Sequence, residues 1–361
     1  MTTGVFDLVP PPSPRPGTRA WLDALFARRP AILAPMEDVS DAPFRRVCRA
    51  LGADLCVTEF VNAEGLLRGA RVALRKIRLA PGDQPTAIQI YGADPDRLVD
   101  AARVAEAAAP VFIDVNCGCW VPKIAARGAG AGWLRDPAAM VDMARRLVAA
   151  VALPVTVKTR VGWGPESHMP IVDLAQRLED AGVAALTIHC RTAQMGHRGA
   201  ADWSWAARAR ARVRIPVAVN GDVRSADDAE RALRETGCAA VMIGRRAIDH
   251  PWVFREVRAL LDRGVRLAPP TLRERLDLCR AHLRANVDER GLPRGVFVSR
   301  RHFAGYLSGF RGAAAIRRAL MAHNTLDGCL RVLDEVEAQL GTAASDPGDE
   351  PVDAAAGTAA A

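Results

Sequence analysis

Lysine is the residue that this 361-residue sequence most clearly lacks. Only Lys76, Lys123 and Lys158 occur among its 49 basic residues, so the other 46 are arginine. Aromatic residues make up 5% of the chain, and no apolar run approaches the roughly 18 to 20 residues that span a bilayer, which excludes an integral membrane protein. Half of the residues are apolar and a quarter are charged, a composition that excludes wholesale disorder. Each remaining lysine is therefore informative about its surroundings.

Paired cysteines and a secretion signal are also missing. The eight cysteines are scattered with no CxxC spacing, and the N-terminal MTTGVFDLVPPPSPRPG has neither a basic n-region nor an apolar h-region. We therefore expect reduced thiols in a cytoplasmic protein. Cys117 and Cys119 lie two positions apart, but such a pair without further clustered ligands is a poor metal site, so we expect no metal.

The charge of the chain is unevenly distributed. The formal net charge is +8 and the pI is about 9.4, which suggests contact with nucleic acid or a phosphorylated ligand. Residues 341–361 carry four acids and no base, so the preceding residues sum to +12. Within them, residues 290–318 hold seven arginines and no acid. We predict a basic surface there that tracks an RNA backbone.

Short apolar runs rich in β-branched residues recur along the chain, each followed by a helical pattern. Continuous apolar runs are typical of strands that are buried on both faces of a parallel sheet. Eight such units predict an α/β fold, a (β/α)8 TIM barrel, with a doubly wound sheet as the alternative. The runs lie at 31–36, 55–60, 85–92, 111–117, 154–160, 185–191, 216–222 and 240–246.

The rhythm changes near residue 270. Residues 271–291 and 302–323 have helical periodicity and no strand-like run follows, which predicts an appended C-terminal α-helical domain. We expect four regions, namely an extended lead-in at 1–28, the barrel at 29–268, the helical domain at 269–340 and a disordered acidic tail at 341–361.

Several apolar runs end in polar residues, and strand ends build the active site of a barrel of this kind. Lys158 is the most informative, because a compact ammonium suits a reduced heteroaromatic cofactor, a Schiff base or a phosphate. The alternative is a lysine at a strand end whose ammonium only reaches out to solvent. His189 is either a cofactor donor or a packed barrel histidine. Glu59 either orients the site or pairs with a neighbouring cation.

The last two runs predict a phosphate site. Glycines there allow backbone N–H groups to approach an anion, and the loops after strands seven and eight bind phosphate in this fold. Asn220, Gly221, Gly244 and Arg245 are the candidates.

Cys119 lies beyond the fourth strand, in a Gly-rich insertion at 118–137. A thiol with an ordinary pKa near 8.5 is mostly protonated at neutral pH and can act as a general acid. A nucleophilic role is the alternative, although no His/Asp pair occurs in this loop to activate the thiol. Cys117, inside the strand, is expected to pack.

Taken together, several motifs resemble those of the tRNA-dihydrouridine synthases, in an order and spacing similar to the bacterial B-type subgroup. They include LAPMEDVSDAPF, AIQIYGADPDRL, FIDVNCGCWVPK, VTVKTRVGW, LTIHCRT, VNGDVRSADDA and VMIGRRAIDHPWVF, and they cover residues 31–255, with a weaker match at 299–317.

The resemblance implies an FMN-containing barrel and a helical tRNA-binding domain. NADPH would reduce the flavin, whose N5 delivers hydride to C6 of a uridine while Cys119 protonates C5. We expect a monomer that binds tRNA through Lys123, Arg300, Arg301 and Arg311. The resemblance assigns FMN contacts to Pro35, Met36, Glu37, Gln89, Asn116, Lys158, His189, Asn220, Gly221, Asp222, Gly244 and Arg245.

The sequence departs from the family pattern at a few positions. Trp120 follows the cysteine where proline is usual, Glu37-Asp38 replaces Ala-Gly, and Arg246 and Asp249-His250 replace small residues. Two other functions stay open, namely a different FMN barrel that acts on a small molecule and a tRNA-binding protein that has lost catalysis.

Overall fold

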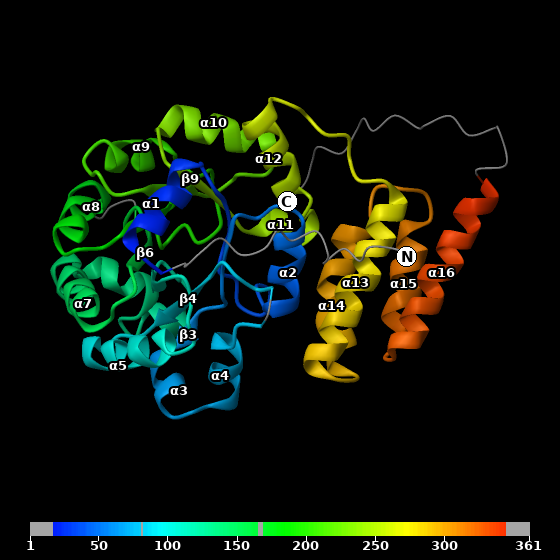
Figure 1. Cartoon of the computed structure of the whole chain (residues 1–361), viewed down its shortest axis with the longest axis horizontal. Helices are drawn as coiled ribbons and strands as arrows, with labels where there is room; N and C mark the ends of the chain where they lie inside the picture. The colour runs from blue at the N-terminus through cyan, green and yellow to red at the C-terminus, as the bar shows by residue number, and fades with distance from the viewer. Residues whose placement is uncertain (1–16, 81, 165–168, 344–361) are drawn as a thin grey trace. The chain divides into compact units, whose positions relative to one another are not determined.

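The computed structural model describes residues 17–80, 82–164 and 169–343. The chain divides into two compact units at the junction of Pro270 and Thr271, an α/β unit followed by a unit of helices. In Figure 1 the first unit runs from blue to yellow-green and the second from yellow to red. No helix among the described residues is both long and apolar enough to cross a membrane.

The first unit is a closed parallel barrel, as the sequence predicts. Each of the eight strands pairs in parallel with the next, β2 pairs with β4, and the register Ala31↔Val241 to Leu33↔Ile243 joins β1 to β9. This closing pair excludes a doubly wound sheet. A short extra strand, β3 (Val61–Asn62), pairs with β4. The barrel strands are β1 Ala31–Leu33, β2 Leu55–Val57, β4 Thr86–Tyr91, β5 Ile113–Cys117, β6 Val155–Arg160, β7 Ala185–His189, β8 Val217–Asn220 and β9 Ala240–Ile243.

The helices surround the strands (Figure 1). Several begin at a side-chain cap, in which Asp41, Asp94, Asp136 or Ser225 accepts a hydrogen bond from a backbone N–H in the first turn. The barrel helices after α1 (Arg19–Ala27) are α2 Ala42–Ala50, α3 Ala63–Leu67, α4 Arg71–Ile77, α5 Pro95–Glu106, α6 Pro122–Ala125, the 3-10 helix η1 Gly130–Arg135, α7 Pro137–Ala150, α8 Ile171–Asp180, α9 Ser204–Arg210, α10 Ala226–Thr236, α11 Arg245–Asp249 and α12 Val253–Arg263.

The expectation of an extended lead-in over residues 1–28 is wrong for its second part. Residues Arg19–Ala27 form α1, capped by Thr18, whose side chain accepts a hydrogen bond from the Trp21 N–H. Leu22, Leu25 and Phe26 pack in one core cluster with first residues of barrel strands such as Leu55. Burial of this apolar face against the barrel stabilises the helix. Residues 1–16 lie outside the described part of the chain.

The second unit contains four helices within the described residues, namely α13 Leu272–Arg290, α14 Arg294–Tyr306, α15 Ala313–Ala322 and α16 Leu326–Ala343. The single helix expected over 302–323 is divided between α14 and α15. Gly309 and Gly312 lie in the break with φ of 77° and 83°, a left-handed conformation that interrupts the helical path and that glycine adopts without strain. Helix α16 continues three residues past the expected boundary at 340, and residues 344–361 of the expected tail lie outside the described residues.

A buried ion pair in the barrel unit provides a test of the fold. The side chains of Arg45 and Asp83 are 2% and 0% exposed, and Arg45 Nε donates to Asp83 Oδ1 at 2.9 Å. Removing one partner leaves the other as an uncompensated buried charge, so Asp83→Ala should lower the free energy of unfolding by about 3–5 kcal/mol in urea titrations.

The control is Asp23→Ala, which removes the ion pair between Arg19 and Asp23, whose side chains are each 50% exposed. Because water screens that pair, its loss should cost no more than about 1 kcal/mol. Equal losses in the two variants would contradict the assignment.

Candidate active site

A cavity of about 600 Å³ opens among the carboxyl ends of the barrel strands. In a parallel barrel these ends lie on one face, so the loops that follow them converge. Most of the predicted site residues line this cavity, namely Pro35, Met36, Glu37, Asn116, Cys119, Lys158, His189, Asn220, Gly221, Asp222, Gly244 and Arg245.

Lys158 projects from β6 toward the end of β8. Its Nζ donates to Asn220 Oδ1 at 3.2 Å, and Asn220 Nδ2 donates to the carbonyl of Met242 at 2.8 Å. Burial, followed by the charge of Arg160, lowers the pKa of Lys158 to about 8. The ammonium is therefore still charged at neutral pH, in a place where the cost of its burial favours an anionic partner.

His189, in contrast to Lys158, is uncharged at neutral pH. Burial, followed by the charges of Arg160 and Lys158, lowers the pKa of His189 well below its usual range. Its Nε2 lies 3.4 Å from Arg191, which can only donate, so Nε2 accepts this long hydrogen bond and Nδ1 holds the ring proton. The neutral imidazole thus provides one hydrogen-bond donor.

The loop that carries Cys119 is held by backbone hydrogen bonds. Asn116 Oδ1 accepts from the N–H of Gly118 at 3.1 Å and from that of Cys119 at 2.9 Å, and the Ala131 N–H donates to the Cys119 carbonyl at 2.9 Å. A Cβ at Gly130, where φ is +58°, would lie 2.7 Å from that carbonyl oxygen, so this position requires glycine. Burial raises the pKa of the Cys119 thiol, which keeps its proton at neutral pH.

Gln89 was expected at the cavity but lies behind it. The residue is fully buried and is absent from the cavity lining. Its Oε1 accepts from Asn116 Nδ2 at 2.8 Å, and its Nε2 donates to Asp114 Oδ2 at 2.5 Å. Burial raises the pKa of Asp114 to about 6 despite hydrogen bonds from Thr156 and Gln89. Gln89 therefore orients Asn116, which in turn holds the Cys119 loop.

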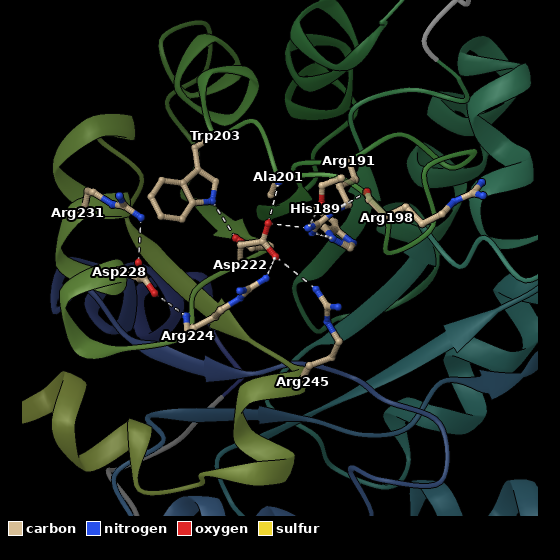
Figure 2. Close-up of polar contacts among 12 residues, drawn as sticks. His189, Arg191, Arg198, Ala201, Trp203, Asp222, Arg224, Asp228, Arg231 and Arg245 are labelled. Atoms are coloured by element: carbon tan, nitrogen blue, oxygen red, sulfur yellow. Dashed lines mark hydrogen bonds and ion pairs between the residues drawn. The ribbon is translucent and has the colours of Figure 1, made fainter. Parts of the chain in front are cut away.

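The predicted phosphate region is organised around the carboxylate of Asp222 (Figure 2). Its Oδ2 accepts from Arg191 at 2.5 Å and from the Ala201 N–H at 2.8 Å, while Oδ1 lies 3.3 Å from Arg245 and 3.5 Å from Arg224. Although burial opposes the effect, the hydrogen bonds from Arg191 and Ala201 lower the pKa of Asp222. A carboxylate repels phosphate, so Asp222 contributes by placing the arginines.

Gly221 gives this region its close packing. Its φ is +115°, and a Cβ there would lie 2.8 Å from the Cβ of Ala201 and 3.1 Å from the ring of His189. The indole N–H of Trp203 donates to the Gly221 carbonyl at 2.8 Å. Only glycine fits this turn, which leaves its backbone at the cavity surface.

The chain is similar to known proteins over most of its length. Residues 32–342 match the family described as Dihydrouridine synthase (Dus). The chain belongs to the dihydrouridine synthase family. It is thus an oxidoreductase that acts on a CH–CH bond, as the sequence predicts, and the resemblance found in its motifs is confirmed.

The relatives of this dihydrouridine synthase family member include several tRNA-dihydrouridine synthases from bacteria. It is 36% identical over 303 residues to the probable tRNA-dihydrouridine synthase 1 of Synechocystis sp., and the aligned region covers 84% of each chain. It is also 36% identical to tRNA-dihydrouridine synthase B of Xanthomonas axonopodis pv. citri, over 82% of this chain and 89% of that protein. The synthase B of Salmonella typhimurium is 35% identical over 86% of this chain and 96% of its own.

Sequence reasoning missed several cavity residues of this synthase family member, among them Phe60, Arg160 and His197. Arg160 lies two positions after Lys158 on β6, and the two-residue period of a strand places both side chains on one face. That period could have identified Arg160. His197 comes from an irregular loop after β7, and no sequence pattern points to it.

Lys76, another of the three lysines, lies beside the site. Lys76, on α4, has only 8% of its side chain exposed and pairs with Glu37 and, at 3.6 Å, with Glu59. Glu59 also accepts a hydrogen bond from the Asp38 N–H at 2.9 Å. Of the two interpretations of Glu59, the structure favours the ion pair. Through Lys76 and the Asp38 N–H, Glu59 holds the segment that carries Glu37. Glu37, Asp38 and Glu59 form an acidic cluster, and Lys76 is the cation that pairs with two of its carboxylates.

Among the residues expected to bind RNA, Lys123 of the barrel unit is absent from the cavity lining. Lys123 is exposed on α6, and Arg301 and Arg311 are exposed in the helical unit. The guanidinium of Arg300, in contrast, donates to the carbonyls of Met321 and His323 at 3.0 and 3.2 Å. Arg300 therefore stabilises the end of α15, whatever else it contacts.

The scarcity of lysine makes the pKa of Lys158 measurable. After reductive methylation with ¹³C, NMR should show one lysine signal, absent from Lys158→Met, that titrates near pH 8. Because the folded pKa lies below the unfolded one, the unfolded chain binds more protons between about pH 8 and 10.5, so this group favours folding increasingly as pH rises through that window. The signals that remain in Lys158→Met are the internal controls, and a midpoint near the ordinary value of about 10.4 would refute the assignment.

Proposed function

We propose that this protein is an FMN-dependent tRNA-dihydrouridine synthase that uses NADPH to reduce the C5–C6 double bond of specific uridines in tRNA. One observation carries the proposal. In this member of the family, the same cavity is lined by the protonated thiol of Cys119, the charged ammonium of Lys158 and the neutral imidazole of His189.

The residues of the cavity fit FMN. The volume of about 600 Å³ is in the range of cofactor sites. Gly221 and Gly244 offer backbone without a side chain, and the exposed guanidinium of Arg245 beside them suits a phosphate. Lys158 suits an edge of a ring system that gains negative charge on reduction. We propose these residues, with Pro35, Met36, Glu37, Asn116, His189, Asn220 and Asp222, as the cofactor site, and Gln89 as the residue that supports it from behind.

Bound FMN would supply the hydride for the uridine ring. The protein's own residues then have separate tasks. Cys119 holds a proton and donates it to C5, since its raised pKa keeps the thiol neutral until a stronger base forms beside it. Lys158 stabilises negative charge, and His189 donates one hydrogen bond without adding charge. The target uridine must leave its stack to reach the cavity, at a cost of a few kcal/mol.

We further propose that residues 29–268 catalyse the reaction, and that the helical region 269–340 binds tRNA together with Lys123. The basic stretch at 290–318, which has no acidic residue in its own sequence, supports that part, because a segment rich in arginine attracts a phosphate backbone. We propose that the protein acts as a cytoplasmic monomer.

The purified protein tests the proposal directly. It should carry or take up FMN, be reduced by NADPH, and form dihydrouridine in tRNA from cells that lack such enzymes. Protein that cannot be loaded with FMN would favour an RNA-binding protein without catalysis. Reduction of a small enone but of no RNA would favour a different FMN barrel.

A cysteine variant tests the general acid. Cys119→Ala should retain FMN and its reduction by NADPH, but dihydrouridine formation should fall about 10²- to 10⁴-fold because C5 has no positioned proton donor. Cys117→Ala is the matched control, since the Cys117 side chain is fully buried in β5. Full turnover in Cys119→Ala would exclude the general-acid role.

Charge reversal tests the RNA surface. Arg301→Glu combined with Arg311→Glu should weaken tRNA binding and lower the slope of log K against log salt by about 0.9 for each phosphate that the variant no longer neutralises, with FMN retained. Arg331→Glu, on the exposed face of α16, is the control for a general charge effect. An equal loss in the control would mean that the 290–318 stretch has no special part. Arg300 is left unchanged because it stabilises α15.

A further inference from the structure

We propose that Trp120 is a stacking surface for the RNA base next to the target uridine. The inference rests on the proposed function, and it adds a residue that holds the RNA at the mouth of the site. Trp120 follows Cys119 in the chain and lines the same cavity.

The indole of Trp120 is open to a ligand. It is 38% exposed, whereas every other tryptophan of the chain is buried or half-buried. A large aromatic ring in water loses favourable burial, and such a ring at the rim of a cavity is typical of a binding surface.

One face of the indole is already covered. A Cβ at Gly196 would lie 3.3 Å from Cδ2, Cε2 and Cζ2 of Trp120, and a point equidistant from three consecutive atoms of a six-membered ring lies on the axis through the ring. Gly196 therefore sits over one face, with φ of +59° and no side chain.

The side chain of Arg160 joins the loop that carries Trp120 to the loop that carries Gly196. Arg160 Nε donates to the carbonyl of Gly118 at 2.8 Å, and its NH1 donates to the carbonyls of Thr192 at 2.9 Å and Gly196 at 2.8 Å. The first loop carries Trp120 and the second carries the glycine beneath it. The indole is thus oriented before any ligand binds, which reduces the entropy lost on stacking.

His197 completes the surface. Its ring meets that of Trp120 edge to face, with centroids 5.8 Å apart and an interplanar angle of 89°. Desolvation, followed by the charges of Arg245 and Arg160, lowers the pKa of His197 to about 4. The imidazole is neutral at physiological pH, so it packs against the indole without adding positive charge to that of Arg245 and Arg246, which line the same cavity.

The position along the chain selects the occupant. The uridine that receives a proton from Cys119 must lie against that thiol, whereas the indole lies one residue further along, at the exposed rim. A nucleotide whose neighbour has been flipped out of the stack loses a stacking partner, and an aromatic side chain can replace it. Since every base has a π face, this surface favours a stacked base of any identity.

Two variants test the inference in the FMN-loaded, full-length protein. Trp120→Ala should raise the KM for tRNA, or lower kcat/KM, by roughly 5- to 150-fold, as loss of one base stack predicts, while Trp120→Phe should retain most of the activity. Trp205→Ala is the matched control, because Trp205 is half-buried on α9 and is outside the cavity lining. FMN content and the rate of flavin reduction by NADPH should be unchanged in all three variants.

A modified RNA identifies the occupant. Once the target uridine is mapped with the wild-type protein, the nucleotide on its 5′ or its 3′ side is made abasic. One of these two RNAs should lose activity with the wild type by about the factor seen for Trp120→Ala, and should lose no more when combined with that variant.

The inference is overturned if Trp120→Ala leaves kcat/KM for tRNA unchanged, if both abasic losses multiply with the Trp120 loss, or if the variant slows flavin reduction by NADPH, which would place the nicotinamide cofactor on the indole. Wild-type protein that forms no dihydrouridine would instead overturn the proposed function.

Discussion

The site of this protein depends on the parallel pairing of β1 with β9, which closes the sheet. Three residue pairs, Ala31↔Val241 to Leu33↔Ile243, join the first strand to the last. Closure brings residues more than 200 positions apart, such as Met36 and Arg245, to one cavity. Because all barrel strands point the same way, most of the polar strand ends lie at that cavity, while the rest of each strand is largely apolar and buried.

Burial acts on the titratable groups of the cavity in opposite directions. Desolvation disfavours whichever form is charged, so it raises the pKa of Cys119 and lowers that of Lys158 and His189. The result is a neutral thiol, a charged ammonium and a neutral imidazole at one pH. A single physical cause thus leaves a protonated thiol and a charged ammonium in one cavity, to which we assign proton donation and the stabilisation of negative charge in the proposed reaction.

A second layer of polar side chains places the first. Asp114, Gln89 and Asn116 form a buried hydrogen-bonded series that ends at the backbone of Cys119, and Arg160 ties the loops after β5 and β7. These residues act mostly through other residues, and their hydrogen bonds to carbonyls and amides leave no signature in composition. Asp222 has the same character, since it orders Arg191, Arg224 and Arg245 around the cavity.

The sequence by itself determined the family, the eight barrel strands and half of the residues that line the cavity, because buried parallel strands are mostly apolar and the carboxyl ends of such strands build the site of a barrel. It also identified Cys119 and Lys158, from their place after a strand and from the rarity of lysine. Only the tertiary structure decided that Gln89 lies behind the cavity, that residues 19–27 form a helix, and that His197 and Gly196 meet Trp120. Those relations join loops and strands distant in sequence, and packing in three dimensions, rather than local periodicity, selects them.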